Sequence, residues 1–365
     1  MHRKLIAAAA VAVTALAGTG AYAYAAADTA EPPQLELLQP TGDDSVGRAQ
    51  LHLVDSDRAD PWVPSERREL MVSMFYPSKK DTGGAAQYMT PKESELFLKQ
   101  SEFDAPPDSL SKVKMYARDD AKPLRSLGKR PLVVVSPGFS KPRASLTGLA
   151  EDLASRGYIA AVVGHNYESV TQFPDGHVTE CEACDQGEAE KAEKGRVKDV
   201  GFVLDQLTDH HSPWSRLIDR HRIAMVGHSL GGATGYSVLR DDKRVKAAMN
   251  IDGTIDALPT TESRKPFMLL GHLIDHDDKT WTEAWKHSAG WKRWVRMKGT
   301  EHVSFTDIGL LLDQFGMPPA QLDERRATRL TRELVSAFLD VHLRGEHRPI
   351  LDSPSADNPE LDFHS

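Results

Sequence analysis

Cysteine is scarce in this chain: only two of its 365 residues are cysteines, and both lie in the tetrapeptide CEAC that begins at Cys181 and ends at Cys184. This count excludes a scaffold held together by many disulfides. A zinc centre would need two further ligands, and only His177 is close in the sequence. A thioredoxin-like redox site would place the pair at the start of a helix, whereas the surrounding segment is polar. In an exported chain, Cys181 and Cys184 are therefore expected to form a local disulfide.

A surplus of positive charge is also missing. Lysine and arginine total 45 against 53 aspartates and glutamates, so the formal net charge is −8, and the sequence has no basic stripe. Because nucleic-acid binding draws on concentrated positive charge, no nucleic-acid partner is expected. With 40% hydrophobic and 27% charged residues, the chain has the composition of a soluble globular protein that can bury a core.

Long apolar runs of low complexity are confined to the N-terminus. Arg3 and Lys4 precede an apolar segment, residues 5–17, and the alanine-rich residues 21–27 offer several A-x-A cleavage sites. The apolar run is shorter than the ~20 residues that a membrane span needs. We expect residues 1–27 to be a secretory signal peptide, residues 28–48 to be a linker, and the mature protein to be secreted.

The rest of the sequence alternates strand-like and helix-like segments. The strand-like runs are nearly continuous in apolar residues, and amphipathic segments separate the later ones, which predicts an α/β fold with a mostly parallel central sheet and helices on both faces. The first two strands have no helix between them, which indicates an antiparallel edge. Residues 49–351 form one domain in this interpretation, and residues 352–365 a frayed polar tail. The expected strands are residues 49–54, 69–76, 131–136, 158–164, 222–227, 245–251, 267–271 and 292–297, and the expected helices are residues 145–157, 192–210, 280–290 and 327–343 and the segment after Ser229.

A serine lies where one of these strands meets a helix. The sequence GHSLG, residues 227–231, matches the pattern G-x-S-x-G. In the fold known for this pattern, the strand turns sharply into the helix and holds the serine in a strained conformation with its Oγ exposed above the sheet. Side chains at Gly227 and Gly231 would crowd that turn. Because a strand and a helix flank the motif, we predict that Ser229 is a nucleophile and not a solvated turn residue.

A serine nucleophile needs a base, and the base needs an orienting acid. In chains built around this turn the order is serine, then aspartate or glutamate, then histidine. His302 lies in a loop shortly after the last expected strand, whereas His287 and His342 fall in expected helices. We therefore predict that His302 is the base.

The position of the acid stays open at this point. Asp252 ends the strand that follows the nucleophile helix, and Asp275, Asp277 and Asp278 follow the next strand. Both loops open at the carboxyl ends of the strands, where Ser229 also lies. The spacing alone does not choose between them.

A serine that attacks a carbonyl carbon creates an oxyanion, which needs two preorganised N–H donors. One is expected to be the backbone N–H of Leu230, directly after the nucleophile. The other is expected from Phe139, in the sequence PGFS after the strand of residues 131–136, where Gly138 leaves room for the turn. This constellation implies no metal and no organic cofactor.

Several segments of the chain resemble one known family. They are GHSLGGAT, NIDGT and GTEHVSFTD, with the longer SPGFSKPRASLTGLAEDLASRGYIAAV, HNYESVTQFPDG and LVSAFLDVHL. Together they resemble the secreted platelet-activating factor acetylhydrolase family, particularly its bacterial members, over roughly residues 49–343. The resemblance implies an α/β-hydrolase fold and a catalytic domain over residues 49–351. It carries the nucleophile, acid and base to Ser229, Asp252 and His302, although Leu230 follows the serine where many relatives carry phenylalanine.

Exported polyester hydrolases of the cutinase type offer a second resemblance. They share the G-x-S-x-G turn and a PGF-like loop but take their acid one strand later, which would be Asp275 in GHLID. The segments NIDGT and HVSFTD fit the first family better. The resemblance therefore favours Asp252.

The expected activity is ester hydrolysis through an acyl-enzyme. The first resemblance implies a phospholipid substrate with a short or oxidised sn-2 acyl chain, or another short-chain ester, and transient contact with lipid surfaces. A cutinase-like polyester hydrolase is the alternative enzyme, and a non-enzymatic binding module on a hydrolase fold is the alternative class. Tyr167, Glu168 and Phe173 are near the site by topology and are candidates for the acyl pocket.

Overall fold

The computed structural model describes residues 34–125, 128–258, 260–272 and 279–364. Every element described below belongs to the unit Leu35–Ser365. The expected signal peptide and the alternative acids Asp275, Asp277 and Asp278 lie outside the described residues. Within the described ranges, no helix is both long enough and apolar enough to cross a membrane.

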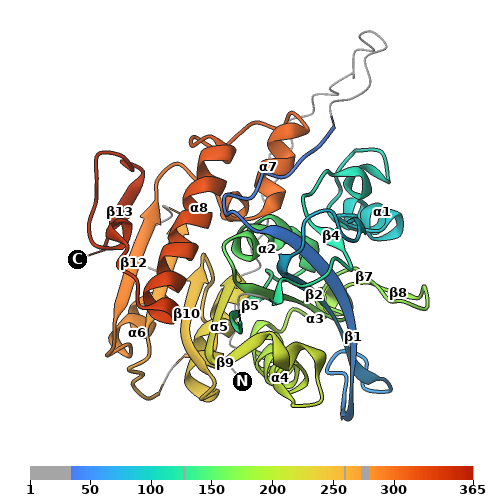
Figure 1. The fold of residues 1–365 in the computed structure, drawn as a ribbon, viewed down its shortest axis with the longest axis horizontal. Coiled ribbons are helices and arrows are strands. Elements are labelled where there is room, and N and C mark those ends of the chain that lie inside the picture. Colours follow the sequence, from blue (N-terminus) through green and yellow to red (C-terminus); the bar gives the residue numbers. More distant parts are fainter. Residues whose placement is uncertain (1–33, 126–127, 259, 273–278, 365) are drawn as a thin grey trace, which may run out of the picture. The chain divides into compact units, whose positions relative to one another are not determined.

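Among the described residues, eleven strands form one sheet in the order β13-β12-β11-β10-β9-β5-β6-β2-β1-β4-β3 (Figure 1). Successive side chains of a strand point to opposite faces, and both faces of the central strands are buried. Val133 and Val135 belong to one apolar cluster, and Leu132 and Val134 to another. Six neighbouring strands are parallel, as predicted: β5 (Arg130–Ser136), β6 (Ile159–His165), β9 (Ile218–His228), β10 (Val245–Ile251), β11 (Phe267–His272) and β12 (Lys292–Met297).

Helices cover both faces of this sheet, which confirms the predicted architecture. One apolar cluster joins the sheet to α2 (Thr147–Ser155) and α8 (Glu324–Leu339). The other joins it to α4 (Ala189–Thr208), α5 (Leu230–Asp241) and α6 (Lys279–Lys286). A π-helical turn, Asp340–Arg344, continues directly from α8.

The predicted antiparallel edge is also confirmed. β1 (Ser45–Ala59) pairs antiparallel with β2 (Arg67–Ser78), and β2 pairs antiparallel with β6. The sheet continues beyond β1 through two short strands, β4 (Arg118–Asp119) and β3 (Gly84–Ala85). A separate small sheet consists of β7 (Thr171–Gln172) and β8 (Val178–Thr179).

The prediction of a frayed C-terminal tail is wrong for its last part. Leu361–Phe363 form β13, which pairs antiparallel with β12. The side chain of Leu361 is buried in the same cluster as α8, and Phe363 packs against that cluster. This three-residue run of apolar, polar and apolar side chains thus forms the edge of the sheet. It was not predicted because so short an alternation in a polar segment is not recognisable as a strand.

Three helices in the described part of the chain were not expected from the sequence. They are α1 (Pro91–Gln100), α3 (Glu182–Gln186) and α7 (Asp307–Gln314). α1 begins with a capping box in which Thr90 and Glu93 bond each other's backbone N–H groups. Leu311 of α7, Phe97 of α1 and Leu37 share a third apolar cluster. Leu37 belongs to the segment predicted as a linker, so this part of the segment is buried in the fold.

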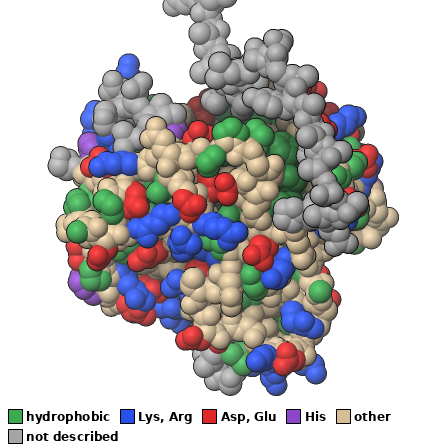
Figure 2. Space-filling model, turned by 90° about the horizontal axis from the view of Figure 1, so that it is seen from above, with side chains coloured by type: hydrophobic (Ala, Val, Ile, Leu, Met, Phe, Trp, Pro, Cys, Tyr) green, Lys and Arg blue, Asp and Glu red, His purple; other side chains and the backbone are tan. Residues whose placement is uncertain are grey.

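The strand order brings four carboxyl ends together. Ser136 of β5 pairs with Gly227 of β9, and His228 of β9 pairs with Ile251 of β10. β11 lies directly beside β10. Loops that leave these strands therefore meet at one edge of the sheet. On the face shown in Figure 2, acidic and basic side chains are interspersed, in keeping with a sequence that has no basic stripe.

Candidate active site

Ser229 occupies a strained turn between β9 and α5. Its backbone has φ 54° and ψ −127°, a conformation that L-residues rarely adopt. The Ser229 N–H donates to the Ile251 carbonyl over 2.7 Å, and the Ser229 carbonyl accepts from the N–H groups of Gly232 and Ala233. These bonds hold the strained residue in place. The structure thus confirms the predicted strand–turn–helix around Ser229.

The flanking glycines are required by close backbone approach. A Cβ atom on Gly227 would lie 2.1 Å from the carbonyl oxygen of Gly231, and one on Gly231 would lie 2.1 Å from that of Ser136. Gly253, which the sequence did not single out, meets the same limit, since its Cβ would lie 2.0 Å from the Ser229 carbonyl oxygen. The turn therefore leaves no room for side chains at these positions.

Asp252 and His302 meet at the carboxyl edge of the sheet. Asp252 follows β10, and His302 begins a short 3₁₀ helix, His302–Phe305, after β12. His302 Nδ1 lies 2.5 Å from Asp252 Oδ2. The Asp252 side chain is 7% exposed and that of His302 is 43% exposed. The structure thus joins the predicted base to the favoured acid and leaves the base open to solvent.

A third residue, His272, completes the surroundings of this carboxylate. Its Nδ1 lies 2.7 Å from each of the two carboxylate oxygens of Asp252, and its backbone N–H donates to Oδ1 over 2.9 Å. Sequence reasoning missed His272. The signal in the sequence was its place directly after the strand predicted at residues 267–271, whereas the position of β11 beside β10 comes from the structure.

These hydrogen bonds control the charge of Asp252. Burial by itself would raise the pKa of this carboxyl, but the hydrogen bonds from His272 and His302 outweigh it and hold the pKa well below its usual range. Asp252 is therefore an anion at neutral pH. A fixed anion at this point can orient His302 and stabilise its protonated form.

His228 links the serine turn to the predicted base. It is buried, its Nε2 lies 2.8 Å from the backbone carbonyl oxygen of His302, and the two rings are 4.5 Å apart. Burial, followed by the nearby charge of His302, lowers the pKa of His228 to about 3. A neutral His228 ring must donate from Nε2 to that carbonyl. Because His228 directly precedes Ser229, this hydrogen bond links the backbone of His302 to the serine turn.

The predicted oxyanion loop lies against the serine. A Cβ on Gly138 would be 3.2 Å from the Cβ of Ser229 and 3.1 Å from Nδ1 of His228. Phe139 follows Gly138, and Leu230 follows Ser229 as the first residue of α5. Leu230 is thus next to the serine in the chain and Phe139 is next to a glycine that approaches it, while their role as donors stays a prediction.

Leu230 and Phe139 both belong to an apolar cluster. Trp62 and Leu230 are buried in it, and Phe139, Tyr167 and Cys181 pack against it. Cys181 is joined to Cys184, which confirms the predicted disulfide. The disulfide loop is thus part of the apolar surface beside Leu230.

The other two candidates for the acyl pocket have different surroundings. Glu168 is buried and accepts a hydrogen bond from Arg196 Nε over 2.7 Å. Phe173 is also buried, and its ring stacks on that of His177 and contacts that of His52 edge-on. Of the three candidates, Tyr167 is the one in the apolar cluster.

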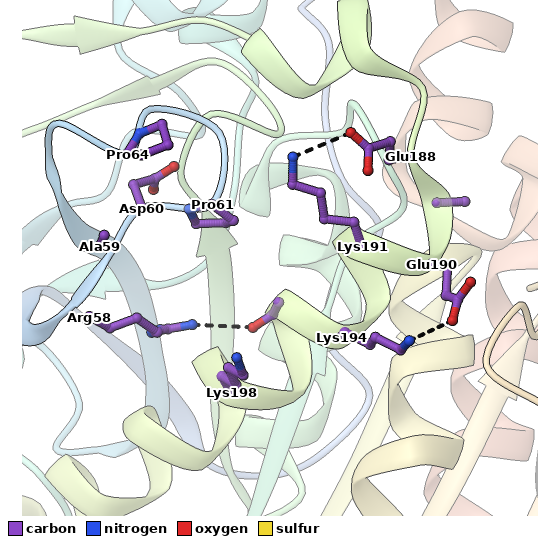
Figure 3. A pocket seen from close by; sticks show the side chains of 12 residues that line it. Arg58, Ala59, Asp60, Pro61, Pro64, Glu188, Glu190, Lys191, Lys194 and Lys198 are labelled. Carbon is purple, nitrogen blue, oxygen red and sulfur yellow. Dashed lines mark hydrogen bonds and ion pairs between the residues drawn. The ribbon is translucent and has the colours of Figure 1, made fainter.

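A groove of about 770 Å³ lies between the β1–β2 connection and the start of α4 (Figure 3). Its walls include Lys191 and Lys194, which pair with Glu188 and Glu190. The Lys191 ammonium also lies 4.5 Å from the ring centre of Trp62, so the groove borders the apolar cluster. The predicted catalytic residues do not line it.

A second serine–histidine–aspartate arrangement lies inside the protein. Ser136 Oγ is 3.0 Å from His165 Nε2, and His165 Nδ1 is 2.8 Å from Asp199 Oδ2. All three side chains are buried, and two bonds from Arg68 hold Asp199. Burial, and then the charge of Arg196, lowers the pKa of His165. Since substrate has no access to Ser136, this arrangement is structural.

Two groups of described residues have donor atoms close enough to share a metal ion. One is the exposed set Asp209, His210 and His211, and the other is Asp252, His272 and His302. In the second set both Nδ1 atoms already bond the carboxylate. Hydrogen bonding accounts for that geometry, so we assign no metal to it.

Comparisons with known proteins place this chain among esterases of the α/β-hydrolase fold. The profile of the PET hydrolase-like family matches residues 87–275. A solved ferulic acid esterase from Streptomyces cinnamoneus is 40% identical, with a TM-score of 0.83, and the match covers 91% of this chain and 99% of that one. A probable 1-alkyl-2-acetylglycerophosphocholine esterase of Arthroderma benhamiae is 26% identical over 263 residues, which are 64% of this chain and 66% of the fungal one. The platelet-activating factor acetylhydrolase of Canis lupus familiaris is 23% identical over 321 residues, 74% of this chain and 71% of its own.

Proposed function

Since this chain belongs to the PET hydrolase-like family of α/β-hydrolases, we propose that it is an exported serine esterase with Ser229 as nucleophile, His302 as base and Asp252 as acid. The observation that carries this proposal is the 2.5 Å contact between His302 Nδ1 and Asp252 Oδ2, beside the strained turn that holds Ser229. Esterase activity itself is common to the relatives named above.

The reaction proceeds in two halves. With Nδ1 bonded to Asp252, His302 uses Nε2 to take the proton of Ser229 Oγ as that oxygen adds to the ester carbonyl carbon. The tetrahedral intermediate collapses, the imidazolium returns the proton to the leaving alkoxide oxygen, and an alcohol departs. Water then adds to the acyl-enzyme by the same proton transfers, which releases the carboxylic acid and restores Ser229.

The oxyanion formed in each half is stabilised by the N–H groups of Phe139 and Leu230. Phe139 belongs to the loop that lies against Ser229, and Leu230 is the first residue of α5. Such donors act most strongly where charge develops, and removing one of them lowers turnover by about 10²–10³-fold in a serine protease.

The proposed substrate is a small ester with an aromatic acyl group of the hydroxycinnamate type. The relative with 40% identity over 91% of this chain is a ferulic acid esterase. The apolar cluster that contains Leu230, the residue after the serine, also includes the rings of Trp62, Phe139 and Tyr167, which are flat side chains of the kind that an aromatic acyl group would contact.

A phospholipid with a short or oxidised sn-2 chain is the second candidate. Its support is the position of the acid, since Asp252 follows β10 as the resemblance to platelet-activating factor acetylhydrolases implies. A polyester is the third candidate, because the family profile that matches is PET hydrolase-like.

A substrate panel tests the proposal. Purified protein and a Ser229→Ala variant are given methyl ferulate, a short-acyl phosphatidylcholine and a polyester film, and the released acid is quantified. Preference for methyl ferulate, abolished in Ser229→Ala, is the expected result. Preference for the phospholipid or the film would select the corresponding alternative. Failure of a fluorophosphonate probe to label the folded protein at Ser229 would favour a binding module.

The proposed export rests on the tripartite N-terminal pattern of residues 1–27. Expression of the full chain in a secreting bacterium should release protein that has lost this segment. N-terminal sequencing of protein from the medium tests the expectation, and retention of the intact chain in the cell would contradict it.

A further inference from the structure

Arg196 of α4 contacts the loop that carries Phe139. Its side chain is only 1% exposed. Its Nη1 donates to the carbonyl oxygen of Pro137 over 2.6 Å, and its Nη2 to the carbonyl oxygen of Gly138 over 3.4 Å. Both carbonyls belong to the short turn between β5 and Phe139.

The second carbonyl shares a peptide unit with the Phe139 N–H, and it also accepts the backbone N–H of Lys141 over 3.3 Å. Peptide bonds of the described residues are all trans, and in a planar trans unit the C=O and N–H point in opposite directions. The Gly138 carbonyl and the Phe139 N–H belong to one such unit. A guanidinium that holds this carbonyl therefore turns the Phe139 N–H away from Arg196. The loop itself lies against the nucleophile, because a Cβ on Gly138 would be 3.2 Å from that of Ser229.

Glu168 holds Arg196 in this orientation. Arg196 Nε donates to Glu168 Oε2 over 2.7 Å, and Trp62 Nε1 donates to Glu168 Oε1 over 3.3 Å. Trp62 is also a member of the apolar cluster that contains Leu230. A buried ion pair contributes little net stability once desolvation is counted. We therefore expect this pair to act on the orientation of the loop more than on the stability of the fold.

We propose that Arg196 is a positioning residue for the oxyanion-binding loop. This inference rests on the proposed function, in which the Phe139 N–H stabilises the oxyanion. By bonding the Pro137 and Gly138 carbonyls, Arg196 acts with the Lys141 N–H to fix the direction of the Phe139 N–H before substrate arrives. Its charge also polarises the peptide unit, so that the N–H is a stronger donor. The benefit arises as the oxyanion charge develops, so it raises kcat and leaves ground-state binding unchanged.

The test compares Arg196→Met with a matched control, Arg48→Met. Arg48 is also buried, bonds Asp119 through two nitrogens and donates to the Gln87 carbonyl, but it lies on β1. We expect Arg196→Met to lower kcat by about 10²-fold, with KM within about twofold of wild type. A boronic acid bound to the serine mimics the tetrahedral intermediate, and its affinity should fall by the same factor as kcat. The control should lose thermal stability at unchanged kcat. Arg196→Lys, which keeps the charge, should have an intermediate kcat.

The outcomes separate three cases. Wild-type kcat and boronate affinity in Arg196→Met, with only a lower Tm, would overturn the inference and leave Arg196 a structural residue. An equal loss of kcat in Arg48→Met would also overturn it, since general destabilisation would then explain the effect. A wild-type protein that neither hydrolyses esters nor reacts with a fluorophosphonate would overturn the proposed function itself. If Arg196→Met does not fold, Arg196→Lys undergoes the same measurements with the same criteria.

Discussion

His272 Nδ1 lies 2.7 Å from both carboxylate oxygens of Asp252. The same carboxylate is 2.5 Å from His302 Nδ1, so a single anion joins two imidazole rings. One ring is proposed to accept the serine proton, whereas the other holds the acid in position. The hydrogen bonds from both rings keep the pKa of Asp252 low in spite of its burial.

His272→Ala should therefore reduce activity without removing any group that touches substrate. A hydrogen bond to a charged group contributes about 1.5–3 kcal/mol, which corresponds to roughly tenfold to a hundredfold in kcat/KM. His272→Asn is the matched variant, because the asparagine amide nitrogen occupies nearly the place of Nδ1 and keeps the donor. Steady-state kinetics of the two variants should rank Asn well above Ala. Equal impairment of both would show that the imidazole ring acts through something other than this bond.

His272 also illustrates which parts of the structure the sequence could predict. The parallel strands were recognisable because strands buried on both faces are continuous apolar runs, and the turn at Ser229 was recognisable from Gly227 and Gly231. The bonds of His272 to Asp252 depend on β11 lying beside β10. Strand adjacency is a tertiary property, and local pattern does not contain it.

The same reason explains the other residues that were missed. Arg196 belongs to an ordinary amphipathic helix in the sequence, and its role follows from the packing of α4 against the turn after β5. The strand β13 and the helix α7 are short elements in segments with weak periodicity. The order of serine, acid and histidine, in contrast, is a property of the chain itself and could be applied directly.

Ser229→Ala and His302→Ala should each lose nearly all activity while staying folded. Members of a cooperating triad each contribute on the order of 10⁴-fold or more in rate, and their losses do not add. The double variant is thus expected to be about as slow as either single variant. Turnover of a chromogenic ester, with circular dichroism as the folding control, provides the comparison. A double variant that is much slower than both singles would contradict a cooperating unit.

The disulfide should matter more for the substrate site than for the fold. It closes a very short loop between Cys181 and Cys184, and the stabilisation from a disulfide grows with loop length. We expect the double variant Cys181→Ser/Cys184→Ser to melt within a few degrees of the parent and to have a higher KM, because Cys181 packs against the cluster of Trp62 and Leu230. An unchanged KM would separate this loop from substrate binding.

Two buried carboxyl groups should make the fold sensitive to pH. Burial is the main cause that raises the pKa of Asp307 to about 7 and that of Glu151 to about 7. Both groups face Arg332, which opposes the shift. Carboxyl groups in the unfolded chain titrate at about pH 4. Between about pH 4 and 7 the folded protein therefore retains protons that the unfolded chain has released. The stabilisation from these two protonated groups is complete below this window and is lost as the pH rises through it.

Asp307→Asn should therefore weaken this pH dependence. The asparagine oxygen can still accept the Gly148 N–H, which now bonds the Asp307 carboxyl over 2.9 Å, but it has no proton to lose. Denaturant unfolding at about pH 5 and about pH 8 should give a smaller drop in the free energy of unfolding for the variant than for the parent. Glu95→Gln, at an exposed carboxylate of α1, is the control and should behave like the parent. An equal drop in Asp307→Asn and the parent would contradict the assignment.

The last prediction separates the two possible acids. Asp252→Asn keeps the size of the side chain but removes the negative charge beside His302, which disfavours the required tautomer and the imidazolium that forms during attack. In a serine protease the same exchange lowers turnover by about 10⁴-fold with the geometry intact. Asp275 lies outside the described residues. Because Asp252 already bonds His302, we expect Asp275→Asn to change stability by about 0.5 kcal/mol or less and the rate little. Both variants are to be assayed on a short-chain ester after each is found to melt near the parent temperature. If Asp252→Asn were active and Asp275→Asn inactive, the acid would be Asp275, one strand later, as in the cutinase type. The contact between His302 and Asp252 would then be structural.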